Sequence, residues 1–476
     1  MSKPTLAIVG ATGAVGSVMR EVISRRIDAW GEIRLIASPR SAGRKLTVRG
    51  EELTVQAISE DAFEGVDIAH FDLPDDVSAH WVPIAAAKGA IVIDKSNAFR
   101  MDPDVPLVVP EANPEQVRNR PKGIIANANC TTLALIPTLA ALHRQFGLES
   151  MTVASYQAAS GAGQEGYDTL YAQLAAVAGK PDLGTRPGDV RDALGDKAND
   201  TFGAPLALNV VPKVGGWKED GWTSEELKVR NESRKILGLP DLAVSSTCVR
   251  VPVIQGHAQA VRATFASDVD VASAHKVLID APGVELVDDP AAGKYPMPID
   301  AAGTDTTYTG RVRASLDFPR SLDFFVVGDN LLKGAALNSA QVAELLLPEF
   351  ELSGRAPQPA GAHHGRGASD NRMPRDHRRL IDRKRPVARA PREAVVPAQP
   401  EAAPAPWEAA PARRAGPSRR RRPHCRSWPP TTGPERTRSS TAPRGFPPRR
   451  PIRTPHPRRH SRRRTSGRGK WRISTA

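Results

Sequence analysis

The hydrophobic pattern of the N-terminal region alternates between two periods. Short continuous apolar runs, which are typical of buried strands, lie at residues 6–9, 32–37, 66–71 and 90–94. Apolar residues at helical spacing predict helices over residues 15–23 and 77–87. Strands that alternate with helices in this way predict a parallel sheet with helical crossovers.

The pattern changes after residue 130, where strand-like and helix-like segments no longer alternate regularly. Runs rich in β-branched and aromatic residues predict strands at 150–157, 205–213, 249–265 and 309–328. Helices are expected at 133–142, 166–178, 224–237 and 331–347. This arrangement predicts an α+β domain after the first domain, and a last helix that packs back onto the first domain.

Charge is distributed unevenly along the 476 residues. The formal net charge is +14, but residues 355–476 alone contain 32 Lys or Arg and 7 Asp or Glu, which leaves residues 1–354 at −11. The C-terminal segment has no sustained hydrophobic period, so it cannot bury enough apolar surface to offset its ordering entropy, and we predict disorder.

The basic residues of this tail are 30 Arg and only 2 Lys. Because Arg, Pro, Ala and Gly have GC-rich codons, we favour the hypothesis that the tail is a frameshifted or read-through product. The alternative is a tail that binds nucleic acid through phosphate charge, but no aromatic interleaving or folded motif supports it.

Cysteine usage and hydropathy indicate a cytoplasmic protein. Cys130, Cys248 and Cys425 do not make a disulfide framework, which agrees with a reducing compartment. The N-terminus lacks the features of a signal peptide. No stretch approaches the roughly 20 uninterrupted apolar residues of a membrane span. We predict no membrane segment and no metal site.

A glycine turn joins the first predicted strand to the first predicted helix. Glycines at Gly10, Gly13 and Gly16 permit a tight turn and the close approach of a pyrophosphate to the helix N-terminus, although an ordinary βα turn is the alternative. The second strand is followed by Arg40 and Ser41 rather than by an acidic residue. An arginine suits a 2′-phosphate, which favours NADP, unless Arg40 is a solvated loop residue.

Cys130 stands in the polar tetrapeptide Asn129-Cys-Thr-Thr132, directly before a helical run. A thiol at a helix N-terminus faces unpaired N–H groups and the positive end of the dipole, which favour thiolate. The alternative is a small buried hydrophobe, as most free cysteines are. Polar neighbours fit a reactive thiol better, and a thiolate near a nicotinamide indicates chemistry at an aldehyde or acyl carbon.

Three further segments contain candidate site residues. Gln157 precedes a small-residue loop and suits amide hydrogen bonds, or it is an exposed turn residue. Glu225 and Lys228 open a capped helix, which by itself is more often a solvated helix start. Arg250 suits bidentate carboxylate binding and His257 suits proton transfer, although a lone histidine is more often structural.

Taken in order, these motifs resemble those of the aspartate-semialdehyde dehydrogenase family over residues 5 to 350. The resemblance rests on Gly10-Ala-Thr-Gly-Ala-Val-Gly16, Ser96-Asn-Ala-Phe-Arg100, Asn129-Cys-Thr-Thr132, Ser155-Tyr-Gln-Ala158, Glu225-Glu-Leu-Lys228, Arg250-Val-Pro-Val253 with Gly256-His257, and Gly328-Asp-Asn-Leu-Leu-Lys-Gly-Ala-Ala336. It implies an α/β fold with a Rossmann-type dinucleotide-binding domain and an α+β catalytic and dimerisation domain. The implied limits are 1–128 for the NADP domain, 129–330 for the catalytic domain, 331–350 for a returning helix and 355–476 for the tail.

The resemblance implies reduction of L-4-aspartyl phosphate by NADPH to L-aspartate 4-semialdehyde, NADP and phosphate, in lysine, threonine and methionine synthesis. It implies Cys130 as nucleophile, His257 as acid/base and Gln157 as substrate-orienting residue. Arg250 would bind the substrate carboxylate, and Glu225 would bind its amino group. The phosphate would be bound by Arg100, Asn129 and Lys228. The implied cofactor-binding residues are Gly10, Thr12, Gly13, Ala14, Val15, Arg40, Ser41, Ser160, Gly161 and Asn330. A homodimer or dimer-based tetramer is also implied.

Two other functions remain open at this point. N-acetylglutamyl-phosphate reductase shares the fold and the cysteine strategy, but favours Pro-Gly-Cys-Tyr where this chain has Ala128-Asn-Cys-Thr131. An inactive relative with a structural role is the other alternative, and the retention of Cys130, Gln157, Arg250 and His257 argues against it.

Overall fold

The structure, a computed structural model, describes residues 3–199 and 201–353. The predictions made for residues 355–476 lie outside the described residues. All structural statements below concern the described part of the chain.

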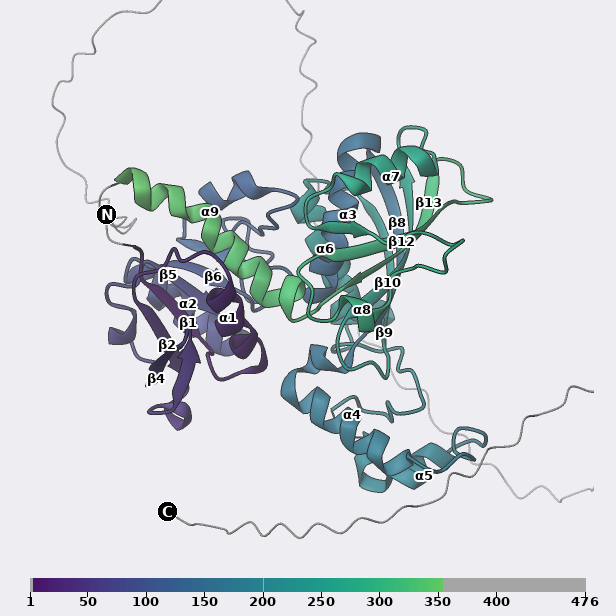
Figure 1. Ribbon diagram of the computed structural model, residues 1–476, viewed down its shortest axis with the longest axis horizontal. Helices are drawn as coiled ribbons and strands as arrows, with labels where there is room; N and C mark the ends of the chain where they lie inside the picture. The colour runs from purple at the N-terminus through teal and green to yellow at the C-terminus, as the bar shows by residue number, and fades with distance from the viewer. Residues whose placement is uncertain (1–2, 200, 354–476) are drawn as a thin grey trace, which may run out of the picture. The chain divides into compact units, whose positions relative to one another are not determined.

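The first of two sheets in the described part is the expected nucleotide-type sheet. Its seven strands follow the order β3-β4-β2-β1-β5-β6-β7 (Figure 1). All neighbouring strands are parallel except β3 and β4. The strands are β1 (Leu6–Val9), β2 (Ile33–Ala37), β3 (Lys45–Val48), β4 (Glu51–Ala57), β5 (Ile68–Phe71), β6 (Ile91–Asp94) and β7 (Ile124–Ala126).

Helices cover both faces of this sheet because each presents apolar residues to it. On one face, α1 (Ala14–Arg25) packs Val15 and Met19 into a core with Leu6 and Ile8. On the other face, α2 (Asp75–Ala87) contributes Val82 to a second core. Two aspartates in the first turn of α2 interact favourably with its N-terminal dipole.

The second sheet has six described strands in the order β11-β12-β13-β10-β8-β9. The pairs β8–β9 and β11–β12 are parallel, and the other pairs are antiparallel. The strands are β8 (Leu148–Gln157), β9 (Ala243–Arg250), β10 (His257–Phe265), β11 (Val284–Leu286), β12 (Thr307–Ala314) and β13 (Ser321–Gly328).

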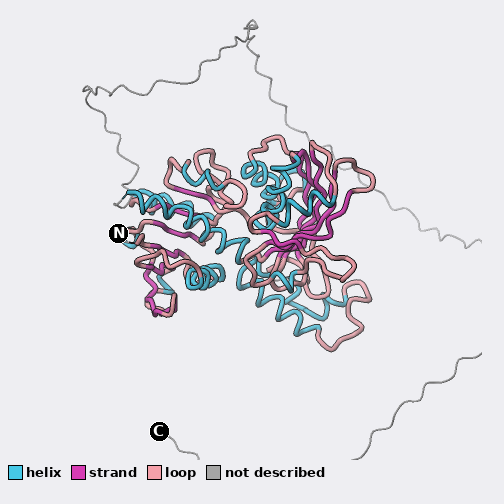
Figure 2. Tube along the Cα trace, turned by 45° about the horizontal axis from the view of Figure 1, so that its top comes forward, coloured by secondary structure: helices cyan, strands magenta, loops and turns pink. Residues whose placement is uncertain are grey.

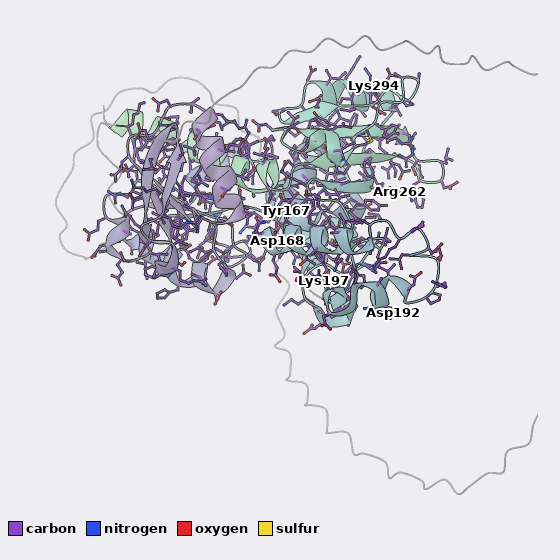
Figure 3. The ribbon with its side chains drawn as sticks, turned by 60° about the horizontal axis from the view of Figure 1, so that its bottom comes forward. Tyr167, Asp168, Asp192, Lys197, Arg262 and Lys294 are labelled. Carbon is purple, nitrogen blue, oxygen red and sulfur yellow. The ribbon has the colours of Figure 1, made fainter. Side chains whose placement is uncertain are left out.

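One face of the second sheet is covered by helices, as Figure 2 shows by colour. Helix α3 (Cys130–Phe146) contacts four strands of the sheet, α6 (Ser224–Leu237) contacts β9, and α7 (Val271–Ile279) contacts β11 and β12. The remaining helices of this region are α4 (Gly163–Val177), α5 (Asp189–Leu194) and α8 (Pro298–Ala301). The side chains labelled in Figure 3 include Tyr167 on α4, whose hydroxyl donates to Gln255 at 2.7 Å.

The C-terminal described segment begins with a π-helical turn, Leu332–Ala336, and continues as α9 (Leu337–Ser353). Leu332, Leu337 and Leu346 share the apolar core of α1 and β1. The returning helix therefore packs on the first sheet (Figure 1).

The sequence predictions of secondary structure need correction in several places, and they did not include β7, β11, α5, α7 or α8. Residues 205–213 form no strand, only a bridge from Val211 to Arg250, because Leu208 adopts a left-handed φ of 60° and Pro212 lacks an N–H. The run 249–265 is interrupted at 251–256, and the run 309–328 is two strands. The hairpin of β3 and β4 was not expected, because its mixed polar residues give no clear alternation.

Membrane crossing was also assessed from the helices. Among the described residues, none of the helices combines the length and hydropathy that a membrane span requires.

Candidate active site

Cys130 is the first residue of α3, as predicted. Asn129 is the N-cap, and its side-chain oxygen accepts the N–H groups of Thr131 at 2.9 Å and Thr132 at 3.4 Å. Asparagine is a favoured cap because it satisfies N–H groups that the helix leaves unpaired. The cap uses both threonine N–H groups, so they are not free to bind a substrate oxygen. The Cys130 N–H has no hydrogen-bond partner among the described residues.

Close packing of the π-helical turn fixes the position of the cysteine. A Cβ atom added at Gly334 would lie 3.1 Å from the Cβ of Cys130. A side chain at Gly334 would push on Cys130, so the turn that begins the returning helix forms one wall of the thiol site.

His257 is the first residue of β10, and its side chain is fully buried. Its Nε2 lies 3.3 Å from the Sγ of Cys130, and its Nδ1 accepts the N–H of Ala158 at 3.1 Å. Because Nδ1 is an acceptor, the neutral ring has its proton on Nε2. The imidazole therefore presents an N–H donor toward the thiol.

The electrostatics of the free site keep this pair neutral. Burial raises the pKa of Cys130, and Glu225 raises it further, against the opposing charges of Lys95, Arg250 and Lys228. Burial, followed by the charge of Arg250, lowers the pKa of His257 to about 3. Desolvation therefore opposes the expected effect of the helix N-terminus on the pKa of the thiol.

Glu225, in the first turn of α6, is the centre of the polar network. Its Oε1 accepts from Asn129 Nδ2 at 2.9 Å, from Gln157 Nε2 at 3.0 Å and from Thr131 Oγ1 at 3.2 Å. Its Oε2 lies 3.4 Å from Lys228 Nζ. Burial alone would raise the pKa of Glu225, but the charge of Lys228 and the side-chain amides lower it to about 2. A carboxylate is thus fixed beside the thiol.

Gln157 and Arg250 are paired residues at the ends of β8 and β9, so the sheet register brings them together. Both side chains are buried. The Nη1 of Arg250 donates to the carbonyl of Ala158 at 2.7 Å. A Cβ added at Gly161 would lie 2.6 Å from this Nη1 and 3.1 Å from the His257 ring, so a larger residue here would displace the Arg250 side chain.

The predicted phosphate residues are connected through α6. Arg100 donates from Nη1 to Glu232 Oε1 at 2.9 Å. Lys228 lies one helical turn before Glu232, and Asn129 donates its backbone N–H to Glu232 Oε2 at 2.7 Å. All three predicted phosphate residues thus contact α6 or belong to it, and their binding of phosphate stays a prediction.

The predicted cofactor residues form two groups in the structure. In the first group, a Cβ at Gly10 would lie 2.3 Å from the carbonyl oxygen of Asp72, so only glycine lets this turn lie against the segment after β5. Thr12 Oγ1 lies 3.4 Å from Ser41 Oγ, and Arg40 is exposed. Gly13, Ala14 and Val15 form the cap and first turn of α1.

In the second group, Ser160 and Asn330 hydrogen-bond to each other, with Asn330 Nδ2 2.9 Å from Ser160 Oγ. Asn330 Oδ1 also accepts the N–H of Gly256 at 2.9 Å. These bonds join the loop after β8 to the segments before β10 and after β13, beside His257.

Sequence reasoning missed several buried charged residues around the site. Glu232 is 1% exposed, and Lys333 is fully buried 2.5 Å from Glu111. The spacing of Glu225, Lys228 and Glu232 on one face of a predicted helix was the available signal for the first of these. No comparable signal indicated the Lys333–Glu111 pair, which joins residues far apart in the sequence.

Two family models match the chain. The model for the semialdehyde dehydrogenase NAD-binding domain matches residues 5–120, and the model for the semialdehyde dehydrogenase dimerisation domain matches residues 139–333. Together they define a two-domain, nucleotide-binding semialdehyde dehydrogenase.

Similar individual proteins show to which family of semialdehyde dehydrogenases this chain belongs. An aspartate-semialdehyde dehydrogenase from Corynebacterium melassecola is 47% identical over 350 residues, which are 72% of this chain and 99% of that protein. The Bacillus subtilis protein of the same name is 43% identical, over 72% of this chain and 96% of its own length. The Vibrio cholerae aspartate semialdehyde dehydrogenase II, solved in complex with ASA, aligns with a TM-score of 0.67 at 37% identity, covering 74% of this chain and all of that one. This chain therefore belongs to the aspartate-semialdehyde dehydrogenase family, which confirms the resemblance and the fold class seen in its sequence.

Proposed function

We propose that this protein reduces L-4-aspartyl phosphate to L-aspartate 4-semialdehyde with NADPH, through a thioester on Cys130. The observation that supports this best is the pairing of the Cys130 sulfur with His257 Nε2 at 3.3 Å, beside the buried carboxylate of Glu225. The step would serve the synthesis of lysine, threonine and methionine, in the cytoplasm.

The charges around the thiol fit the amino-acid end of this substrate. Glu225, with a pKa of about 2, stays ionised and suits the α-ammonium group. Arg250 is buried and suits the α-carboxylate, because its planar guanidinium can donate two parallel hydrogen bonds. Gln157 holds Glu225 in place with one amide N–H and can orient the substrate with the other.

In the first half-reaction, Sγ attacks the acyl carbon and the bond from that carbon to the phosphate oxygen breaks. The thiol would lose its proton as it attacks, because the thiolate is the nucleophile, and the departing phosphate would accept that proton and leave as hydrogenphosphate. Arg100, Asn129 and Lys228 would hold the departing phosphate. The oxyanion that develops on the acyl oxygen would be stabilised by the Nε2–H of His257, which lies 3.3 Å from the sulfur, and by the Cys130 N–H.

The tight turn at Gly10 and Gly16 fits a dinucleotide, since a Cβ at Gly16 would lie 2.2 Å from the Gly10 carbonyl oxygen. Thr12, Ser41 and Arg40 would hold its phosphates, with Arg40 favouring NADPH over NADH. When bound, NADPH supplies the hydride that reduces the thioester carbon. His257 would act on the carbonyl oxygen as the acid, giving a hemithioacetal on Cys130. Collapse of the hemithioacetal would return the proton to His257, break the C–S bond and release the aldehyde, with the sulfur leaving as thiolate. In the reverse direction His257 would be the base.

We propose a homodimer or a dimer-based tetramer, in which the second sheet contributes the main interface. Support comes from the match to a dimerisation domain and from large apolar residues that the isolated chain exposes, among them Tyr156 on β8, Ile299 and Leu316. We also propose domain limits at 1–128 and 129–330, with residues 331–350 returning to the first domain.

Glu225 argues against N-acetylglutamyl phosphate as the substrate. An N-acetylated amine is neutral, so it would bring the buried carboxylate of Glu225 no charged partner in addition to Lys228, while the larger group would still have to be accommodated beside it. The free α-ammonium of aspartyl phosphate provides that charged partner.

The direct test is phosphate-dependent reduction of NADP with L-aspartate 4-semialdehyde as the substrate. We expect turnover that requires inorganic phosphate and that is much slower with the N-acetylglutamate aldehyde. Faster turnover of the N-acetylated aldehyde would overturn the substrate assignment, and turnover of neither would overturn the proposed activity.

A further inference from the structure

Glu232 is a buried acidic residue for which the proposed chemistry has no use, yet it contacts two parts of the site. Its side chain is 1% exposed. Its Oε1 accepts from Arg100 Nη1 at 2.9 Å, and its Oε2 accepts the backbone N–H of Asn129 at 2.7 Å. One carboxylate therefore joins a cation from the first domain to the residue that precedes Cys130.

The guanidinium of Arg100 is only partly satisfied by these contacts. Its Nη2 donates to the carbonyl of Lys95, and its Nη1 donates to Glu232. Its Nε is buried and has no hydrogen-bond partner among the described residues. A buried guanidinium with an unused donor is suited to an anion, which agrees with a phosphate site at Arg100.

Helix α6 also binds the segment around Arg100 through the side chain of Lys235. The Nζ of Lys235 donates to the carbonyl oxygens of Arg100, Asp102 and Val105, each at 2.7 Å. Glu225, Lys228, Glu232 and Lys235 follow each other by three or four residues, so they lie on one face of α6. A single helix face thus presents the amine-binding carboxylate and a phosphate-binding lysine, and also holds Arg100 by its side chain and backbone.

We propose that Glu232 is a positioning residue that fixes the phosphate-binding guanidinium of Arg100 relative to the capped start of α3, and hence to the sulfur of Cys130. The inference rests on the proposed function, because it gives Arg100 the leaving phosphate as its ligand. Binding of that phosphate is thereby coupled to the placement of the attacking thiol. Glu232 touches neither substrate nor cofactor in this account.

The substitution Glu232→Gln tests whether Glu232 positions Arg100 or only fills a buried place in the fold. A glutamine has one acceptor oxygen, so it can accept from Arg100 or from the Asn129 N–H, but its amide N–H₂ then faces the other donor. Glu226→Gln is the matched control. Glu226 is also buried on α6, and each of its oxygens also accepts one hydrogen bond, in this case from the backbone N–H groups of Thr223 at 2.8 Å and Cys248 at 3.0 Å, away from Arg100.

The experiment compares steady-state kinetics of both variants in the oxidative direction, with phosphate, NADP and L-aspartate 4-semialdehyde varied in turn. We expect Glu232→Gln to raise the KM for phosphate by about tenfold or more, the scale of one charge-assisted hydrogen bond, while the KM for NADP stays within about twofold. Glu226→Gln should lower the melting temperature without a selective change in the KM for phosphate. Equal losses in all parameters in both variants would overturn the inference.

Two further measurements keep the inference testable if Glu232→Gln folds poorly or if the proposed function fails. Glu232→Asp retains the charge, and it should recover part of the phosphate affinity. The rise in melting temperature caused by inorganic phosphate does not require turnover. It should shrink in Glu232→Asp and in Arg100→Lys, and the two effects should not add in the double variant. Additive effects would overturn the positioning role, whereas a wild-type protein that binds phosphate but lacks turnover would overturn only the proposed activity.

Discussion

His257 Nε2 lies 3.3 Å from the sulfur of Cys130, while the other ring nitrogen of His257 accepts the N–H of Ala158. The two contacts fix both the orientation and the tautomer of the imidazole. A neutral ring with its proton on Nε2 is a donor to an oxyanion, and in this tautomer Nε2 has no lone pair to accept the proton of the thiol. Under the proposed mechanism that proton would pass to the departing phosphate as the sulfur attacks.

Replacing Glu225 by Gln should weaken binding of the amino-acid end of the substrate. The change removes the buried charge that faces the α-ammonium group, and hydrogen bonds to charged groups contribute about 1.5–3 kcal/mol, so kcat/KM for L-aspartate 4-semialdehyde should fall by roughly 10- to 150-fold. The same substitution should change kcat/KM much less for succinate semialdehyde, which lacks the amino group. Equal losses of kcat/KM for the two aldehydes would show that Glu225 does not bind the amino group.

Replacing Arg40 by Ala should reduce the preference for NADP over NAD. Arg40 is exposed on the short helical turn Pro39–Ser41 after β2, where a 2′-phosphate would lie. We expect the Kd for NADP to rise by about 10- to 100-fold, the scale of one or two charge-assisted hydrogen bonds, with little change for NAD. Titration of both dinucleotides measures this ratio. Arg44→Ala, at a nearby exposed arginine, serves as the control, and a similar ratio in both variants would refute the role of Arg40.

The buried pair of Lys333 and Glu111 should be a strong determinant of stability. Lys333→Met leaves the Glu111 carboxylate buried without its partner, so the free energy of unfolding should fall by about 3–5 kcal/mol. Adding Glu111→Leu should restore much of this loss. Urea unfolding provides the measurement, with Arg25→Ala at the exposed Arg25–Asp305 pair as a control that should cost about 1 kcal/mol or less. A loss no greater than that of the control would contradict the prediction.

The fold was predictable in segments where the hydrophobic pattern of the sequence fits only one type of secondary structure. The apolar runs at 6–9 and 90–94 have one interpretation because buried parallel strands are continuously hydrophobic. The apolar run at 205–213 was wrongly predicted as a strand. The backbone N–H groups of Leu206 and Ala207 donate to the side-chain oxygen of Gln173, and Leu206 and Val211 pack in a small separate core. Local composition cannot distinguish these outcomes, since the difference lies in which tertiary partner accepts the backbone hydrogen bonds.

The residues of the candidate site were predictable from the sequence, but the hydrogen bonds that orient them were not. Motif order indicated Cys130, Gln157, Arg250 and His257, and the fold brings them together. The tautomer of His257 depends on the N–H of Ala158, and the position of Arg100 depends on Glu232, which lies 132 residues away in the chain. The sequence favoured a lowered pKa for Cys130, whereas burial raises it. This desolvation could not be predicted, because it arises only from the folded surroundings of the thiol.

Acid stability should depend on His70, whose ring is buried on β5 with both nitrogens lacking partners among the described residues. Burial lowers its pKa from 6.5 to about 4. Because the unfolded chain binds this proton and the folded protein does not, its contribution to stability is complete above pH 6.5 and declines as the pH falls toward 4. The free energy of unfolding should fall by about 1.4 kcal/mol per pH unit in this window from His70 alone.

The variant His70→Leu tests this contribution. It should remove that part of the slope when urea unfolding is followed from pH 7 to pH 4, whereas His80→Gln, at an exposed histidine of α2, should not. An unchanged slope in His70→Leu would mean that the ring is already protonated in the fold.

The central claim is that Cys130 becomes acylated. Intact-protein mass spectrometry after mixing the enzyme with L-aspartate 4-semialdehyde and NADP, without phosphate, measures this directly. The account predicts one aspartyl group per chain on the peptide that contains Cys130, its release on addition of phosphate, its absence in Cys130→Ala, and its retention in Cys248→Ala. NADP binding should be largely intact in Cys130→Ala. Phosphate-dependent turnover that persists in Cys130→Ala, or an aspartyl group on another residue, would contradict the account.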